Sequence, residues 1–188
     1  MKIGVLAIQG DFAEHILMLK RLDVETVEVR LPSHLDRLDG LILPGGESTT
    51  IGKLSMDFGL LKPLRKFGTT HAIWGTCAGA IFLSKDARRR QPLLGIMDIT
   101  VERNAFGRQV DSFEADLTIP ELDGGGPYHA IFIRAPIIET VQGDTRVIST
   151  LPDGRIVAAR QGKLLATSFH PELTQDTRFH QYFLSLAK

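Results

Sequence analysis

The stretch IWGTCAGAIF, residues 73–82, contains the only cysteine of the chain and determines the predicted fold. The apolar residues before Gly75 are typical of a short buried strand, and those after Cys77 favour a helix that begins at once. Gly75 and Gly79 stand two positions from the cysteine on either side, where a sharp strand-to-helix turn leaves little room for a Cβ atom. The stretch therefore predicts a nucleophile elbow with cysteine in place of serine. The alternative is a glycine-rich turn around a small buried cysteine without chemical function.

Strands and helices are expected to alternate in the first half of the chain, and strands to dominate the second half. The expected strands are residues 3–8, 24–29, 41–43, 72–74, 96–102, 110–118, 128–133, 147–150, 156–160 and 163–169. The expected helices are residues 12–22, 49–67 with interruptions near Phe58-Gly59 and Pro63, 78–84, and an amphipathic helix at the end of the chain.

Two patterns distinguish the halves of the predicted sheet. A continuous apolar run such as residues 3–8 is typical of a strand buried on both faces of a parallel sheet. Polar and apolar residues alternate at 112–117, which is typical of an antiparallel strand with one solvated face. The sequence therefore predicts a single α/β domain over residues 1–188, with a mostly parallel central sheet flanked by helices and an antiparallel extension.

Composition excludes several classes of function. Lys and Arg together number 22, as do Asp and Glu, so no net basic charge would attract nucleic acid or an anionic membrane. The run Arg88-Arg89-Arg90 alone indicates a solvated loop or a partner contact. One cysteine excludes an internal disulfide, and six scattered histidines lack metal-ligand spacing, so we expect no bound metal. The short apolar N-terminal run resembles neither a spanning helix nor a signal peptide, and we expect a cytoplasmic protein.

The stretch SFHPEL, residues 168–173, contains the base and the orienting acid that a cysteine nucleophile requires. Pro171 disfavours helix at the residue before it, so His170 is expected in an extended conformation. Side chains two apart in an extended chain point the same way, which would let Glu172 accept a hydrogen bond from His170. The other histidines, at positions 15, 34, 71, 129 and 180, lack such a neighbour and are interpreted as ordinary surface or core residues.

The stretch LILPGGEST, residues 41–49, is the third candidate element of the site. It follows a predicted strand, and open parallel sheets bind ligands at the carboxyl ends of their strands. Its two glycines would let backbone N–H groups approach an oxyanion, and the N–H of Ala78 at the elbow would do the same. The alternatives are a phosphate-binding loop or a plain turn, although the GK[ST] ending of a Walker loop is absent.

The Gly-x-Cys-x-Gly elbow followed by His-Pro-Glu resembles class I, or triad-type, glutamine amidotransferases. Within that class the chain is similar to the glutaminase subunits of pyridoxal 5'-phosphate synthase. The stretches that carry this likeness are GVLAIQGDFAEH (4–15), LILPGGESTT (41–50), GTCAGA (75–80), VERNAFGRQVDSFEADL (101–117), FIRAP (132–136) and FHPELT (169–174). The resemblance implies a flavodoxin-like α/β fold and hydrolysis of L-glutamine to L-glutamate and ammonia.

The resemblance also implies a role for each matching residue. Cys77 would attack the side-chain amide and form a glutamyl thioester, His170 would transfer the proton to departing ammonia, and Glu172 would orient His170. The N–H groups of Gly46 and Ala78 would form the oxyanion hole. The residues implied to hold L-glutamine are Gly46, Glu47, Ser48, Arg103, Ile133 and Arg134. Gln9 would lie near the oxyanion loop and the partner, as a residue of the activation interface.

The implied partner is a pyridoxal 5'-phosphate synthase subunit that receives the ammonia in a hetero-oligomer. The resemblance implies no cofactor, no nucleic acid and no membrane. A freestanding cysteine hydrolase or peptidase on the same fold is a second hypothesis, which predicts activity without a partner. A non-catalytic binding relative is a third hypothesis, which predicts a cysteine that glutamine analogues do not modify.

Overall fold

The computed structural model describes residues 1–103 and 112–188, so the first two residues of the predicted strand 110–118 lie outside it. The strands are β1 (Lys2–Leu6), β2 (Glu25–Val29), β3 (Gly40–Leu43), β4 (Ala72–Thr76), β5 (Ser84–Asp86), β6 (Met97–Glu102), β7 (Ser112–Leu117), β8 (Tyr128–Ile133), β9 (Ile137–Val141), β10 (Arg146–Thr150), β11 (Ile156–Gln161) and β12 (Leu164–Thr167). The helices are α1 (Phe12–Arg21), α2 (Ser48–Asp57), α3 (Leu61–Phe67), α4 (Ala78–Leu83) and α5 (Arg178–Ala187), with 3₁₀ helices at Pro32–Leu35 and Pro171–Leu173.

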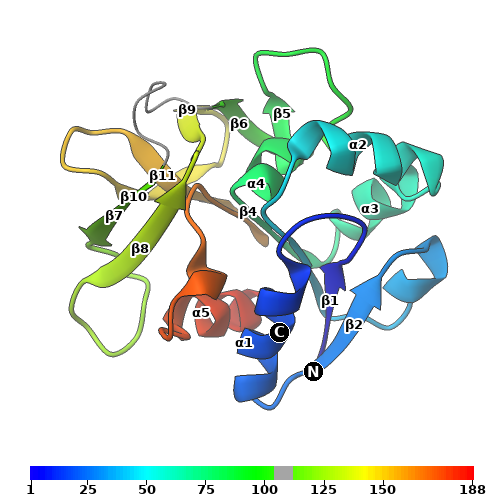
Figure 1. Cartoon of the computed structure of the whole chain (residues 1–188), viewed down its shortest axis with the longest axis horizontal. Helices are drawn as coiled ribbons and strands as arrows, with labels where there is room; N and C mark the ends of the chain where they lie inside the picture. Colours follow the sequence, from blue (N-terminus) through cyan, green and yellow to red (C-terminus); the bar gives the residue numbers. More distant parts are fainter. Residues whose placement is uncertain (104–111) are drawn as a thin grey trace.

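The large sheet combines a parallel half with an antiparallel half (Figure 1). Strands β2, β1, β3, β4 and β12 lie side by side in that order, and each pairs in parallel with its neighbour. Beyond β12 the sheet continues through β11, β9 and β6 with antiparallel pairing. Strands β7 and β8 form a separate antiparallel pair. The predicted α/β class, with a parallel centre and an antiparallel extension, is confirmed.

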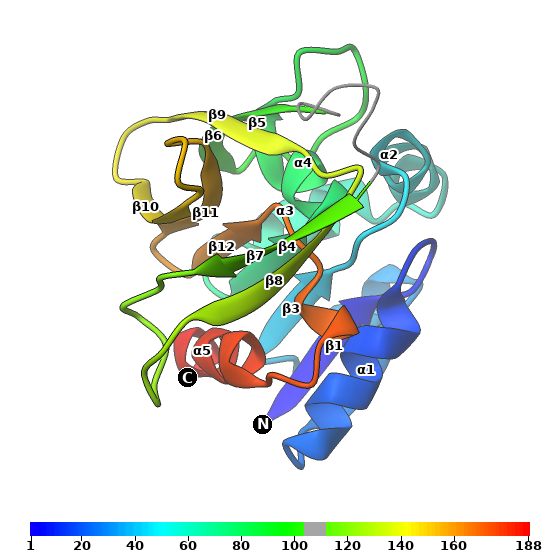
Figure 2. The ribbon, with the colours of Figure 1, turned by 60° about the vertical axis from the view of Figure 1, so that its left-hand side comes forward.

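Helices cover both faces of the parallel half, which explains why its strands are apolar on both sides. Figure 2 shows α1 and α5 on one face, and α2, α3 and α4 on the other. Trp74 of β4 packs against Phe183 of α5, with 5.6 Å between ring centroids. Its neighbour Ile73 points to the opposite face and joins the core that contains Leu64 of α3. Successive side chains of a strand alternate between faces, so one short strand anchors two cores.

The differences from the predicted elements are local. The predicted interruption near Phe58-Gly59 separates α2 from α3, but Pro63 lies inside the first turn of α3 and does not break it. N–H groups in a first helical turn have no intrahelical acceptor, so a proline is tolerated there. Strands β5 and β9 were not predicted, because their sequences, SKD and IIETV, show neither a continuous apolar run nor strict alternation of polar and apolar residues.

Within residues 1–103 and 112–188, no helix combines the length and apolar character that crossing a bilayer requires. The parallel strands β1, β3, β4 and β12 all run in the same direction, so the loops that follow them gather at one edge of the sheet. These loops contain Gln9, Gly46, Cys77 and His170, respectively.

Candidate active site

Cys77 lies at the sharp turn between β4 and α4, as predicted for an elbow. Its backbone has φ 47° and ψ −107°. A residue with a Cβ atom adopts such a conformation only at a cost in free energy, and residues strained in this way are found mainly at active sites. A Cβ atom on Gly75 would lie 2.5 Å from the carbonyl carbon of Gly79. A Cβ atom on Gly79 would lie 1.9 Å from the carbonyl oxygen of Leu43. Both glycines are therefore required by close backbone approach.

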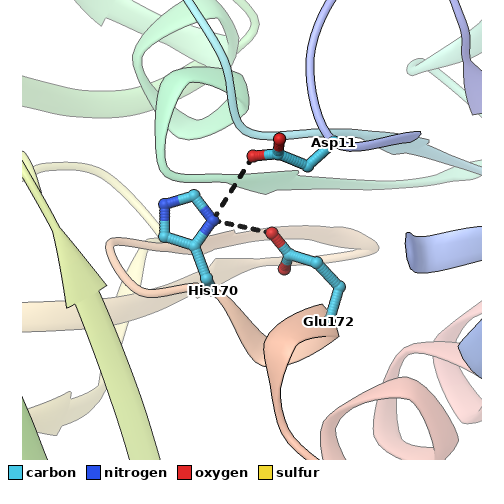
Figure 3. Close-up of side chains that lie close together, drawn as sticks. All are labelled: Asp11, His170 and Glu172. Atoms are coloured by element: carbon cyan, nitrogen blue, oxygen red, sulfur yellow. Dashed lines mark hydrogen bonds and ion pairs between the residues drawn. The ribbon is translucent and has the colours of Figure 1, made fainter. Parts of the chain in front are cut away.

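His170 and Glu172 form a short hydrogen bond, with 2.7 Å between Nδ1 and Oε1 (Figure 3). The side chain of Glu172 has no exposed surface. The expected extended conformation of this segment was wrong, because Pro171 begins a 3₁₀ helix that contains Glu172. The fixed φ of proline suits the first position of a helical turn, and this turn, not strand alternation, brings the two side chains together.

The other ring nitrogen of His170 remains for Cys77. Both contacts drawn in Figure 3 end on Nδ1, one from Glu172 and a longer one of 3.7 Å from Asp11. Burial lowers the pKa of His170, but hydrogen bonds to Cys77 and Glu172 outweigh burial and raise the pKa to about 10. An imidazolium at neutral pH is the partner that a thiolate nucleophile requires. Burial raises the pKa of Glu172, opposed by its hydrogen bond to His170.

A cavity of about 470 Å³ opens above the sulfur of Cys77 and is large enough for an amino acid. The predicted site residues that line it are Gln9, Gly46, Glu47, Ser48, Cys77, Ala78, Arg103, Ile133, Arg134 and His170. Glu172 lies behind His170, outside the lining. The structure thus gathers the predicted residues at one place, although their individual roles stay predictions.

Glu47 and Arg103 contact each other at the cavity, which the sequence did not indicate. Their side chains form an ion pair with 2.9 Å between Oε1 and Nη2. The Glu47 carboxylate also accepts hydrogen bonds from the N–H groups of Thr49 and Thr50, and so caps the start of α2. Desolvation raises the pKa of Glu47, but these hydrogen bonds outweigh it and lower the pKa to about 2. Glu47 is therefore ionised at any pH near neutral.

The loop after β1 contacts the loop after β3. The N–H of Glu47 donates to Oε1 of Gln9 over 2.8 Å, and the N–H of Asp11 donates to the carbonyl oxygen of Gly45 over 3.1 Å. The predicted oxyanion-hole residue Gly46 has φ 144°, and a Cβ atom there would lie 2.4 Å from Oε1 of Gln9. Gln9 therefore lies directly against the predicted oxyanion loop.

Sequence reasoning missed several residues of this region. Asp11, Ile81, Pro136 and Leu173 also line the cavity. His15 is a buried core residue, in agreement with its interpretation, but the sequence did not indicate that its Nε2 lies 3.3 Å from Oε2 of Glu172. His129 is an exposed surface residue, as also interpreted, and contacts Glu114 and Asp116 on the neighbouring strand β7. Only the position of Asp11, just beyond β1, offered a signal, since ligand sites lie at strand ends.

Asp11, His170 and Glu172 offer ligand atoms within 4.8 Å of one another, so among residues 1–103 and 112–188 they form the group that could hold a cation. The hydrogen bond between Nδ1 of His170 and Oε1 of Glu172 would have to break for both atoms to bind an ion. The hydrogen bond between His170 and Glu172 therefore explains why these side chains lie together without an ion. The expectation that the protein binds no metal stays a prediction.

Comparison with known proteins places this chain in a family. The sequence model of the SNO glutamine amidotransferase family matches residues 5–187. The chain is 59% identical to the "Pyridoxal 5'-phosphate synthase subunit PdxT" of Herpetosiphon aurantiacus, covering 99% of this chain and 100% of that protein. It is 55% identical to the subunit of the same name from Dehalococcoides mccartyi, covering 100% and 98%. A solved "crystal structure of glutamine amidotransferase" matches with a TM-score of 0.92 and 52% identity over 98% of both chains. The chain therefore belongs to the SNO glutamine amidotransferase family, as its motifs predicted.

Proposed function

We propose that this chain is a glutaminase that hydrolyses L-glutamine and supplies the ammonia for pyridoxal 5'-phosphate synthesis, with Cys77, His170 and Glu172 as its catalytic triad. The observation that carries the proposal is the 2.7 Å hydrogen bond from His170 to Glu172, with His170 and Cys77 lining the same cavity and Cys77 among the groups that raise the pKa of His170. The similarity to pyridoxal 5'-phosphate synthase subunits supports the pathway.

The chemistry follows from the order of these groups. The sulfur of Cys77 attacks the amide carbon of glutamine, and the N–H groups of Gly46 and Ala78 stabilise the resulting oxyanion. His170 donates its proton to the amide nitrogen, which leaves as ammonia, and a glutamyl thioester remains. His170 then takes a proton from water, the hydroxide attacks the thioester, and the thiolate leaves. The new carboxyl group loses its proton to solvent and departs as glutamate. Glu172 orients the imidazole throughout.

The ion pair of Glu47 and Arg103 suits the zwitterionic end of glutamine. A guanidinium binds an α-carboxylate through two parallel hydrogen bonds, and a carboxylate accepts hydrogen bonds from an α-ammonium group. Glu47 and Arg103 therefore offer both charges side by side at the cavity. Ser48, Ile133 and Arg134 complete the proposed binding set around the same space.

A second protein is part of this proposal, because ammonia is volatile and becomes protonated in water. A synthase subunit docked beside the cavity would receive the ammonia directly. Gln9 is proposed to lie at that interface, since it contacts the oxyanion loop at the N–H of Glu47. The cytoplasmic location expected from the sequence stays a prediction.

The test is glutamate production from glutamine by the pure chain, with and without the synthase subunit of the same organism. We expect strong activation by that subunit. Equal activity in both mixtures would favour the freestanding hydrolase. No glutamate in either mixture, together with a Cys77 that 6-diazo-5-oxonorleucine leaves unmodified, would favour the non-catalytic relative.

The pH dependence of hydrolysis is a further expected result. Burial lowers the pKa of His170, but its hydrogen bonds raise the pKa to about 10, so the imidazolium that protonates the leaving amide nitrogen persists to that pH in the free enzyme. We expect kcat/KM for glutamine, which follows the ionisation of the free enzyme, to stay level from neutral pH upward and to fall only near pH 10. The variant Glu172→Gln weakens one of these hydrogen bonds, so its alkaline fall moves to lower pH. A wild-type fall near the ordinary histidine pKa, about 6.5, would contradict this assignment.

A further inference from the structure

Two buried histidines lie behind Glu172, on the side away from His170. His15 on α1 and His180 on α5 have no exposed surface. Nε2 of His15 lies 3.3 Å from Oε2 of Glu172 and 3.2 Å from Oγ1 of Thr76. Nδ1 of His15 lies 3.0 Å from Nε2 of His180. A series of polar contacts therefore runs from Glu172 through His15 on α1 to His180 on α5, inside the core.

Oxygen Oε2 of Glu172 needs a donor. It is fully buried, and none of the described residues gives it a well-aligned hydrogen bond. A buried carboxylate oxygen without a donor loses its interaction with water and gains nothing in return. Nε2 of His15 lies 3.3 Å from this oxygen and is the donor atom that faces it, although the same nitrogen is better aligned with Oγ1 of Thr76 at 3.2 Å. A small rotation of the ring would share the Nε2–H proton between the two acceptors.

The surrounding groups determine which nitrogen of His15 carries the proton. Burial, with smaller contributions from His180 and His170, lowers the pKa of His15, and burial lowers that of His180 to about 3, so both rings are neutral. The other charged group that acts on Glu172 is Asp11, beyond His170. A bare Nε2 facing the Glu172 carboxylate would place a lone pair against a negative charge. The proton therefore belongs on Nε2, and Nδ1 of His15 accepts from Nε2–H of His180.

This assignment also accounts for His180, the last residue in this series of polar contacts. If His180 donates through Nε2, its Nδ1 is an acceptor, and Nδ1 is the atom of His180 that has no hydrogen-bond partner among the described residues. An unpaired neutral acceptor costs less than an unpaired charge, so the arrangement leaves Nδ1 of His180 as its unpaired nitrogen, at the end farthest from Glu172.

We propose that His15 is a positioning residue whose Nε2–H holds Oε2 of Glu172, and thereby fixes the ring of His170 toward Cys77. The proposal rests on the glutaminase function proposed above. The same Nε2–H contacts Thr76, the residue directly before Cys77, so His15 links the His-Pro-Glu turn to the elbow. A side chain that only filled space would not need a donor at this point.

Three variants separate positioning from packing in the complex with the synthase subunit. His15→Leu removes the donor, and we expect kcat to fall about 10- to 100-fold while KM for glutamine stays within about twofold. His15→Gln keeps an N–H donor at a similar reach, and we expect it to regain most of that loss. Phe183→Leu removes buried volume against Trp74 without touching Glu172, and we expect lower stability with kcat and its pH profile unchanged.

A second measurement does not depend on activity or on the folding of a variant. Nitrogen-15 NMR of the wild-type histidines should find His15 neutral and protonated on Nε2, and a far-downfield proton on Nδ1 of His170. This result would support the positioning role even if the chain hydrolysed no glutamine. A His15 protonated on Nδ1, or a His15→Leu variant with wild-type kcat, would overturn the proposal.

Discussion

The variant Cys77→Ala should lose glutamine hydrolysis by at least about 10⁴-fold, the largest effect on activity that we expect. No other cysteine in the chain offers a replacement nucleophile. The proposed attack requires a sulfur in hydrogen-bond contact with His170, and alanine provides no atom that forms the thioester. The measurement is glutamate release in the complex with the synthase subunit, over times long enough to detect the residual rate.

Binding and fold provide the controls for this variant. Alanine removes one atom from a nearly buried side chain, so we expect an unchanged circular dichroism spectrum and glutamine binding close to that of the wild type. The matched variant Cys77→Ser keeps a hydroxyl in place of the thiol, and its weaker nucleophile should also lose at least about 10³-fold. Turnover by Cys77→Ala within tenfold of the wild type would exclude the thioester route.

The variant Gly79→Ala should destabilise the fold by roughly 3 kcal/mol or more, the largest effect on stability that we expect. Its Cβ atom would lie 1.9 Å from the carbonyl oxygen of Leu43, an atom of the sheet backbone that cannot rotate away. Relief requires α4 to move from β3, and the elbow at Cys77 moves with it. Chemical denaturation measures the loss, and the surviving folded fraction should hydrolyse glutamine poorly.

Gly162→Ala separates this clash from the general cost of replacing a glycine. Gly162 lies in the turn between β11 and β12 with φ 57°, and a Cβ atom there meets no other atom within 4 Å. We expect a loss of about 1–2 kcal/mol from backbone strain alone, with activity retained. If Gly79→Ala cost no more than Gly162→Ala, the close approach of α4 to β3 would not be what requires glycine at the elbow.

The variants at Cys77 and Gly79 concern the elbow, a stretch whose local structure was predictable from the sequence. Gly75, Cys77 and Gly79 lie within five residues, so the crowding of Gly75 against Gly79 is visible in the sequence alone. The approach of Gly79 to the carbonyl oxygen of Leu43 depends on how β3 packs beside the elbow. The pairing of His170 with Glu172 was also predicted, although from a strand conformation that the structure replaces with a 3₁₀ turn. Side chains two residues apart can meet in either conformation. The contact between His170 and Glu172 could therefore be predicted correctly even though the backbone conformation was not.

The contacts that join distant parts of the chain were not predictable in this way. Glu47 meets Arg103 because the loop after β3 and the end of β6 reach the same cavity. His15 meets Glu172 because α1 packs beside the turn that follows β12. Neither pair has a spacing or a motif that marks it, since each depends on the order of strands in the sheet.

The sequence by itself determined the chemistry of this protein: a lone cysteine at an elbow, a histidine and a glutamate after a strand, and a glycine-rich loop. Each of these is a short-range pattern, and short-range sterics and hydrogen bonding decide it. The tertiary structure alone decided which side chains from distant parts of the chain contact one another there, such as His15 with Glu172 and Arg103 with Glu47. The physical reason is that parallel pairing of β1, β3, β4 and β12 brings their ends together, and pairing partners are chosen by packing of the whole sheet.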